Sequence, residues 1–149
     1  LFNWLMHDVR DARVLDLFAG SGALAFEALS RGARSALLVD ASPAVCAQLT
    51  RELAQLAGAD ARVQRGDALA LLRQPPAATF DLVFLDPPFH QDLPAQAIPL
   101  LEQSGLLADQ AWIYVEAEQD PAAVPANWRL HRRSQAGQSC GLLYRREAA

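Results

Sequence analysis

The sequence has 149 residues, 52% of them hydrophobic and 20% charged, which is typical of a folded domain and excludes an intrinsically disordered chain. The net charge of −4 lacks the basic surplus of most nucleic-acid-binding proteins, and no apolar run approaches the roughly 18 residues of a membrane span. Cys46 and Cys140 are too far apart for a metal-binding or disulfide pattern. We therefore expect one cytoplasmic domain, residues 1–149, without a signal peptide.

Short apolar runs predict strands at residues 14–18, 35–40, 80–85 and 111–116, and a further strand is expected at 61–65, with Gly66 and Asp67 at its end. Residues 119–127 contain two prolines and are expected to form a loop. After this loop, residues 128–133 and 139–146 are predicted to form an antiparallel hairpin around Gly137.

The spacing of apolar residues predicts helices between these strands. The first helix opens the chain, with apolar residues on one face at Leu1, Phe2, Leu5, Met6 and Val9. Further helices are expected at 23–31, 43–57, 68–73 and from Pro94 onward, with Ser42 and Asp92 as N-caps. Pro99 is expected to kink the last of these helices or to delay its start. The alternation of strands and helices predicts a parallel α/β sheet with right-handed crossovers.

Polar residues follow each of the first four predicted strands. Asp16 precedes the glycine turn Gly20-Ser21-Gly22, and Asp40, Asp67 and Asp86 stand at the ends of the next three strands. Because open α/β sheets bind ligands at the carboxyl ends of their strands, these residues predict a binding site along one edge of the sheet.

The glycine turn admits two classes of ligand. Gly20-Ser21-Gly22-Ala23-Leu24-Ala25 fits the dinucleotide pattern Gly-x-Gly-x-x-Ala, and Asp40 follows Gly20 by 20 positions, as a ribose-binding carboxylate would. Asp16, however, would repel a pyrophosphate and attract a cationic amino-acid group. S-adenosylmethionine carries an ammonium, a sulfonium, a ribose and an adenine, so Asp16, Asp40 and Asp67 suit it better than NAD. Asp67 is also expected to cap the helix that follows it.

The segment from Phe80 to Phe89 forms a strand and then a rigid corner. Only Asp81 interrupts the apolar run at 80–85, which suits a central strand covered on both faces. Pro87 and Pro88 fix the backbone and remove two donors, so the carbonyl groups of this corner are free to accept hydrogen bonds. Asp86, these carbonyls and the ring of Phe89 together suit a planar molecule that carries an amino group.

Two of these motifs resemble those of class I S-adenosylmethionine-dependent methyltransferases. Asp16-Leu-Phe-Ala-Gly-Ser-Gly is similar to their first motif, and Asp86-Pro-Pro-Phe to the motif of those that methylate amino groups. The finer resemblance is to the bacterial 16S ribosomal RNA (guanine(966)-N2) methyltransferase family. It extends over nearly the whole chain, through Leu1-Phe-Asn-Trp-Leu, Phe18-Ala-Gly-Ser-Gly-Ala-Leu, Glu27-Ala-Leu-Ser-Arg-Gly-Ala, Phe84-Leu-Asp-Pro-Pro-Phe, Ile113-Tyr-Val-Glu and Pro125-Ala-Asn-Trp.

The resemblance implies a fold, a reaction and a set of site residues. The fold is a Rossmann-like class I methyltransferase fold, with a mostly parallel seven-stranded sheet, helices on both faces and a C-terminal antiparallel hairpin. The reaction is metal-free methylation of a guanine N2 amine in 16S rRNA, within an assembling small ribosomal subunit, by a monomer. The implied catalytic residues are Asp86, Pro87, Pro88 and Phe89. The implied residues for S-adenosylmethionine are Asp16, Phe18, Ala19, Gly20, Ser21, Gly22, Asp40, Ala41, Asp67, Ala68 and Asp86. The family normally carries a basic amino-terminal arm, which is absent from this sequence.

Three other functions stay open. The same corner would serve an amino-methyltransferase that acts on DNA or protein. An NAD-dependent oxidoreductase would need a proton-relay residue, and no His or Tyr/Lys pair follows the strand at 80–85. A non-catalytic adaptor would not need the full set of aspartates and glycines.

Some polar residues near the carboxyl terminus have two interpretations each. Glu116 either borders the pocket or is an ordinary acid at the end of a strand. The arginines of the terminal hairpin either contact phosphates or form a solvated face, which the sequence slightly favours: Arg129, Arg132, Arg133, Arg145 and Arg146.

Overall fold

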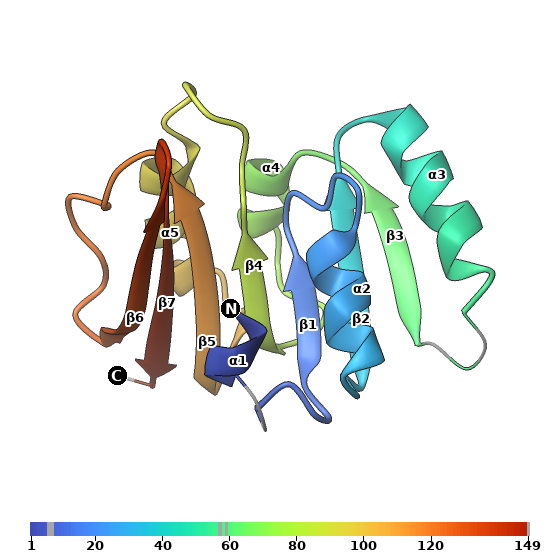
Figure 1. Ribbon diagram of the computed structural model, residues 1–149, viewed down its shortest axis with the longest axis horizontal. Coiled ribbons are helices and arrows are strands. Elements are labelled where there is room, and N and C mark those ends of the chain that lie inside the picture. The colour runs from blue at the N-terminus through green and yellow to red at the C-terminus, as the bar shows by residue number, and fades with distance from the viewer. Residues whose placement is uncertain (6–7, 57, 59, 149) are drawn as a thin grey trace.

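The computed structural model describes residues 1–5, 8–56, 58 and 60–148, and one sheet runs through them (Figure 1). The described part of the chain contributes seven strands, in the spatial order β3-β2-β1-β4-β5-β7-β6. In chain order these are β1 (Arg13–Asp16), β2 (Ser35–Asp40), β3 (Ala61–Arg65), β4 (Phe80–Leu85), β5 (Leu107–Ala117), β6 (Trp128–Ala136) and β7 (Ser139–Glu147). Strands β1 and β4 are neighbours near the middle of the sheet.

Strands β1 to β5 run parallel to one another. Leu15 of β1 lies opposite Leu37 of β2 on one side and Val83 of β4 on the other, and β3 and β5 extend the parallel part outward. Strand β7 pairs antiparallel with both β5 and β6. This arrangement confirms the predicted fold class, including the C-terminal antiparallel hairpin.

Helices cover both faces of the sheet. On one face α1 (Phe2–Leu5), α2 (Ala23–Ser30) and α3 (Pro43–Leu53) bury Leu5, Ala25 and Leu49 against the sheet. On the other face α4 (Ala68–Leu72) and α5 (Leu93–Gln103) bury Leu72 and Leu101. Figure 1 shows α2 in front of the central strands and α4 and α5 behind them. None of the helices in the described residues is long and apolar enough to cross a membrane.

Two short polar side chains begin helices as the sequence predicted. The Ser42 hydroxyl accepts a hydrogen bond from the Val45 N–H at 3.3 Å, and Pro43 opens α3. The Asp67 carboxylate accepts from the Ala70 N–H at 2.9 Å. Each cap satisfies a backbone N–H that the first turn of a helix leaves without a partner. Both caps also fix where the chain leaves the carboxyl edge of the sheet.

The last helix departs from its prediction at both prolines. Helix α5 begins at Leu93, before Pro94, and continues through Pro99, so the expected delay of its start is wrong, while the alternative of a kink at Pro99 stays a prediction. Pro99 is exposed, as is Ala95, the residue whose carbonyl loses its helical hydrogen-bond partner to the proline. Asp92 stands at the N-cap position with φ 54° but makes no capping hydrogen bond through its side chain, which corrects the predicted cap.

Other element boundaries also moved. Helix α1 covers four residues, and Met6 of the predicted face lies outside the described residues, although Val9 is buried with Leu5. Strand β5 begins at Leu107 rather than at 111, because the Phe80 N–H donates to the Leu106 carbonyl and Phe80 pairs with Leu107 before a bulge. Strand β6 extends to Ala136, since it pairs with β7 along its length.

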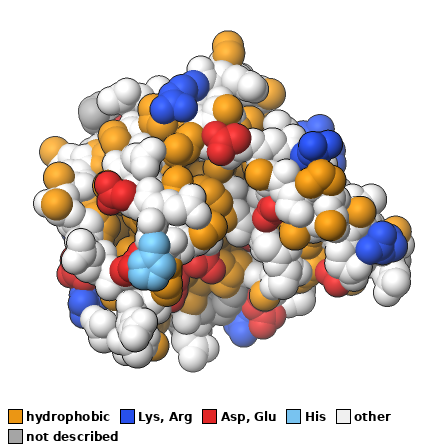
Figure 2. Space-filling view, turned by 90° about the horizontal axis from the view of Figure 1, so that it is seen from above, with side chains coloured by type: hydrophobic (Ala, Val, Ile, Leu, Met, Phe, Trp, Pro, Cys, Tyr) orange, Lys and Arg blue, Asp and Glu red, His pale blue; other side chains and the backbone are white. Residues whose placement is uncertain are grey.

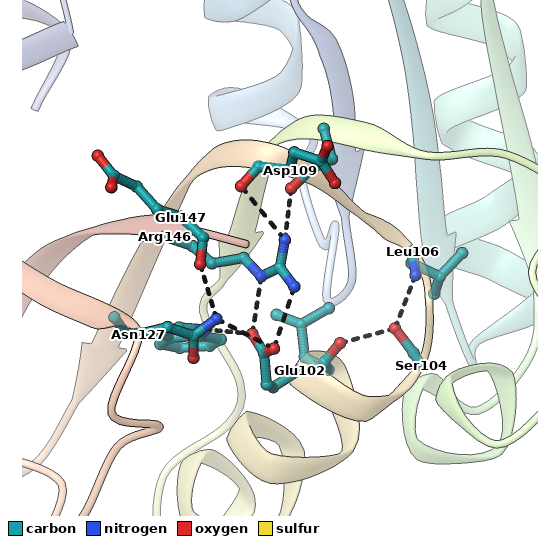
Figure 3. Close-up of polar contacts among 10 residues, drawn as sticks. Glu102, Ser104, Leu106, Asp109, Asn127, Arg146 and Glu147 are labelled. Atoms are coloured by element: carbon teal, nitrogen blue, oxygen red, sulfur yellow. Dashed lines mark hydrogen bonds and ion pairs between the residues drawn. The ribbon is translucent and has the colours of Figure 1, made fainter. Parts of the chain in front are cut away.

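A polar cluster fastens the terminal hairpin to α5 (Figure 3). Glu102 of α5 accepts from Arg146 of β7 through Nε at 2.8 Å and Nη2 at 3.1 Å, and from the Trp128 indole N–H at 2.7 Å. Arg146 Nη1 also donates to the Ala108 carbonyl at 2.7 Å, and the Asn127 amide donates to the Glu147 carbonyl at 2.8 Å. The cluster therefore ties the start of β5 and both hairpin strands to one helix.

Candidate functional site

Four parallel strands, β1 to β4, end at one edge of the sheet, and a cavity of about 400 Å³ opens there. Figure 2 looks onto this edge and shows hydrophobic side chains in the middle of the face with acidic side chains around them. Most of the predicted site residues line the cavity: Phe18, Gly20, Asp40, Ala41, Asp67, Ala68, Asp86, Pro87 and Pro88. Five predicted residues do not line it: Asp16, Ala19, Ser21, Gly22 and Phe89.

The two glycines of the first turn serve different purposes. Both have positive φ, 54° at Gly20 and 82° at Gly22, which glycine adopts without strain. A Cβ added at Gly22 would lie 2.5 Å from a ring carbon of Phe26 and 2.7 Å from a methyl of Leu49. Gly22 is thus required by the packing of α2 and α3. A Cβ at Gly20 would meet no described atom within 4 Å, and Gly20 lines the cavity.

Asp40 holds the glycine turn in place from the end of β2. One carboxylate oxygen accepts from the Gly20 N–H at 3.0 Å and the other from the Ser42 N–H at 2.9 Å. A carboxylate has about four acceptor positions, so Asp40 retains capacity for a ligand in the cavity that it lines. Asp67 is in a similar state, because its cap to Ala70 uses one oxygen and it lines the same cavity.

Asp16 lies beneath the cavity rather than on its wall. The residue is 1% exposed, and its Oδ1 atom has no hydrogen-bond partner among the described residues. Burial raises the pKa of Asp16 to about 7, with a further rise from the negative charge of Asp86 and a smaller one from Asp40. A nearby cation would therefore stabilise the ionised form of this carboxyl group.

Asp86 and the two prolines stand where two cavities meet. Asp86 is accessible to solvent, yet partial desolvation by the surrounding protein raises its pKa, and the negative charge of Glu116 raises the pKa further. Pro87 and Pro88 line the first cavity and also a second one of about 460 Å³. Phe89, whose side chain is 40% exposed, lines the second cavity alone.

The second cavity contains acidic residues at the end of β5 and just after it. Glu116 is the best supported of them, because Ser139 Oγ donates to its Oε1 at 3.0 Å and the Tyr114 hydroxyl donates to its Oε2. The sequence alone allowed Glu116 to be either a pocket residue or an ordinary acid at the end of a strand, and the structure places it in this cavity. Glu118, also in the cavity, lies 3.1 Å from His90 Nδ1.

Four residues that were not predicted as site residues complete the wall of the first cavity: Leu17, Gly66, Gln91 and Leu93. Gln91 lies between the proline corner and α5, and Leu93 is the first residue of α5, so the position of both depends on the path of that loop.

The arginines of the terminal hairpin differ in their surroundings. Arg146 is held by Glu102, and Arg133 pairs with Asp120 at 2.8 Å. Arg145 lies over the Trp112 ring, 4.8 Å from its centroid, and donates to Gln110. Arg129 and Arg132 are exposed on β6. Arg146 is therefore neither a free phosphate contact nor a solvated residue, because its guanidinium is bound by Glu102 and holds the hairpin to α5.

A larger hollow lies elsewhere. It has a volume of about 660 Å³ and lies between α2 and α3, lined by residues such as Phe26, Leu29 and Leu56. It contains no residue of the predicted site. Within the described residues no group of three or more His, Cys, Asp or Glu side chains could hold a metal ion.

Comparisons with known proteins agree with this geometry. The family model described as "Conserved hypothetical protein 95" matches residues 1–145. The chain is 49% identical over 150 residues to Ribosomal RNA small subunit methyltransferase D of Escherichia coli, a match that covers 99% of this chain and 75% of that protein. The protein of the same name from Haemophilus influenzae is 44% identical over 141 residues, covering 92% and 73%. The solved structure of yhhF from Escherichia coli has a TM-score of 0.94 at 50% identity, covering 99% of this chain and 82% of that one.

Proposed function

Because this chain belongs to the family described as Conserved hypothetical protein 95 and is similar over its length to proteins named Ribosomal RNA small subunit methyltransferase D, we propose a specific reaction for it. The protein transfers a methyl group from S-adenosylmethionine to the exocyclic N2 amine of a guanine in 16S rRNA. The observation that carries the proposal is the junction of two cavities at Asp86-Pro87-Pro88, one for the methyl donor and one for the base.

The first cavity fits a cationic ligand. Asp40, Asp67 and Asp86 line it, Asp16 lies beneath it, and none of its described lining residues is Lys, Arg or His. A pyrophosphate would meet only like charges there, whereas an ammonium and a sulfonium would be attracted. Asp40 would bind the ribose hydroxyls, Asp67 would accept from the adenine amino group, and Asp16 would face the ammonium. When bound, S-adenosylmethionine supplies a methyl group on a positively charged sulfur that leaves as a neutral thioether.

The proline corner positions the amine that receives the methyl group. Asp86 and the Pro87 carbonyl accept the two N2 hydrogens, which directs the nitrogen lone pair away from both and toward the first cavity. Phe89 stacks on the base in the second cavity. One N2 proton is lost as the new N–C bond forms, and Asp86 takes it or passes it to water. Positioning of this kind contributes roughly 7–11 kcal/mol to lowering a barrier.

The target base must leave its stack to reach this corner. Enzymes that modify a base in folded RNA act on nucleotides that are unstacked or splayed out. The exposed ring of Phe89 offers such a base a surface to stack on. We propose that the substrate is 16S rRNA within an assembling small subunit, where protein contacts hold the nucleotide in an accessible conformation.

Two measurements test the proposal. Calorimetric titration should show binding of S-adenosylmethionine and no binding of NAD. Binding of NAD alone would contradict the methyltransferase function and favour an oxidoreductase. Transfer of labelled methyl groups is then measured on naked 16S rRNA and on small subunits from cells that lack the protein. The methyl group should map to a guanine N2, while labelling of DNA or protein alone would contradict the RNA substrate.

A further inference from the structure

Two carboxylates lie side by side at the junction of the cavities. Strands β4 and β5 pair in parallel with Leu85 opposite Val115, so Asp86 and Glu116 follow at neighbouring positions. The charge of Glu116 acts on Asp86 directly, as one of the two causes that raise the pKa of Asp86. Asp86 lines the first cavity and Glu116 lines the second. A base that presents its amine to Asp86 therefore has Glu116 as a neighbour.

Glu116 is held rigidly by neutral donors. Its two oxygens each accept one hydrogen bond, from the Tyr114 hydroxyl and from Ser139 Oγ. Burial and this hydrogen bond raise the pKa of Tyr114, so its hydroxyl stays a donor. A Cβ at Gly141 would lie 2.5 Å from the Tyr114 hydroxyl oxygen, so a glycine on β7 leaves room for that ring. Two occupied acceptor positions leave Glu116 able to accept at least one more hydrogen bond.

The other acidic residues of the second cavity differ from Glu116 in their partners or exposure. Glu118 pairs with His90 at 3.1 Å, and Asp120 pairs with Arg133 at 2.8 Å. Asp92 is exposed at the start of α5. Glu116 is thus the carboxylate next to Asp86 whose hydrogen-bond donors among the described residues are the hydroxyl groups of Tyr114 and Ser139, which leave its negative charge uncompensated.

Among the bases that carry an exocyclic amine, guanine alone presents a second donor beside it. Its N1–H adjoins the N2 amine, whereas adenine and cytosine place a ring nitrogen acceptor next to theirs. A carboxylate facing that position would accept the guanine N1–H and repel the lone pair of the other bases. We propose that Glu116 is the residue that selects guanine, by accepting its N1–H while Asp86 and Pro87 hold the amine. This inference rests on the proposed function.

The base analogue 2-aminopurine isolates this contact, because it keeps the N2 amine but has an acceptor at N1. The full-length protein is tested on small-subunit RNA that carries either guanine or 2-aminopurine at the methylated position. We expect the wild type to prefer guanine by roughly 100-fold or more in kcat/KM, since a site built for a donor rejects an analogue without it. Comparable rates on both bases would overturn the inference without any variant.

Substitution of Glu116 then assigns the preference to this residue. Glu116→Gln should weaken the transfer to guanine, because its neutral amide oxygen accepts the N1–H less strongly than a carboxylate does. The variant should gain relative to wild type on 2-aminopurine, since its amide N–H can donate to N1. The affinity for S-adenosylmethionine should stay unchanged in calorimetry. Glu118→Gln, in the same cavity, is the matched control and should keep the preference of the wild type.

The possible outcomes separate the two proposals. Equal loss on both bases in Glu116→Gln would show a merely structural role and sink the inference. Should that variant not fold, Ser139→Ala keeps the carboxylate but removes one support, and it should narrow the preference several-fold; an unchanged preference would count against Glu116. A wild-type protein that methylates no guanine would instead overturn the proposed function itself.

Discussion

Asp86 is the single residue on which the proposed transfer depends most. We expect Asp86→Ala to bind S-adenosylmethionine within a few-fold of wild type, since Asp40, Asp67 and the glycine turn still line the cavity. Methyl transfer should fall roughly 100-fold or more, because the amine loses both its acceptor and a route for its proton. Calorimetry and a single-turnover transfer assay measure the two effects separately. Unchanged turnover would remove the role assigned to this carboxylate.

Asp16 should reveal itself through the dependence of stability on pH. Its pKa is about 7 in the folded protein, against an ordinary value of 3.8 for an aspartate exposed to water. The stability that protonated Asp16 contributes is complete below pH 3.8 and is lost as the pH rises through 7. Asp16→Asn does not titrate, so its free energy of unfolding should exceed that of wild type increasingly between pH 5 and pH 8, by on the order of 2 kcal/mol. Urea unfolding across this range measures the difference, and a constant difference would indicate an ordinary pKa.

At the scale of an element, the two glycines of the glycine turn should contribute differently to stability. Gly22→Ala should destabilise the protein by about 2 kcal/mol or more, because its Cβ would overlap the side chains that join α2 and α3. Gly20→Ala faces only the backbone cost of positive φ, about 1 kcal/mol. Denaturant unfolding compares the two variants. Equal losses would mean that packing at Gly22 adds nothing to the strain.

The terminal hairpin should depend on one acid of α5. Burial raises the pKa of Glu102, but hydrogen bonds from Arg146, Trp128 and Asn127 outweigh this and leave the pKa lowered. Glu102→Ala would leave the largely buried charge of Arg146 without its carboxylate partner and should lower the free energy of unfolding by about 3 kcal/mol. Glu27→Ala, which breaks an exposed pair with Arg31 at 3.6 Å, is the control and should change stability by about 0.5 kcal/mol at most. A loss at Glu102 no larger than the control would contradict the fastening role.

At the scale of the whole molecule, the first cavity exists only while four strand ends are aligned. S-adenosylmethionine should therefore bind the folded state alone and stabilise it by about 2.7 kcal/mol at a concentration of 100 Kd. The Tm should rise with its concentration, while NAD should leave the Tm unchanged. A Tm that does not respond to S-adenosylmethionine would contradict the assignment of this cavity.

Local sequence patterns predicted much of the architecture. The bounds of β2, β3 and β4 agree with the predicted ranges. Strands β2 and β4 are short apolar runs with a sharp polar end, whereas β3 is largely polar and its end is marked by Gly66 and Asp67. The error at Leu107 arose because pairing with β4, which lies far away in the sequence, extends β5 toward its start. The misjudged start of α5 reflects tertiary burial of Ala97, Ile98 and Leu101, which outweighs the local preference against proline.

By itself the sequence determined the alternation of strands and helices, the acids at successive strand ends and the proline corner, because each is encoded by neighbouring residues. Only the tertiary structure placed Asp16 beneath the cavity wall instead of on it, since burial depends on all the elements that surround a side chain. It also brought Glu116 beside Asp86 through the register of β4 and β5. Pairing between strands that are distant in the chain leaves no local sequence pattern, so the sequence alone does not predict which residues lie opposite each other.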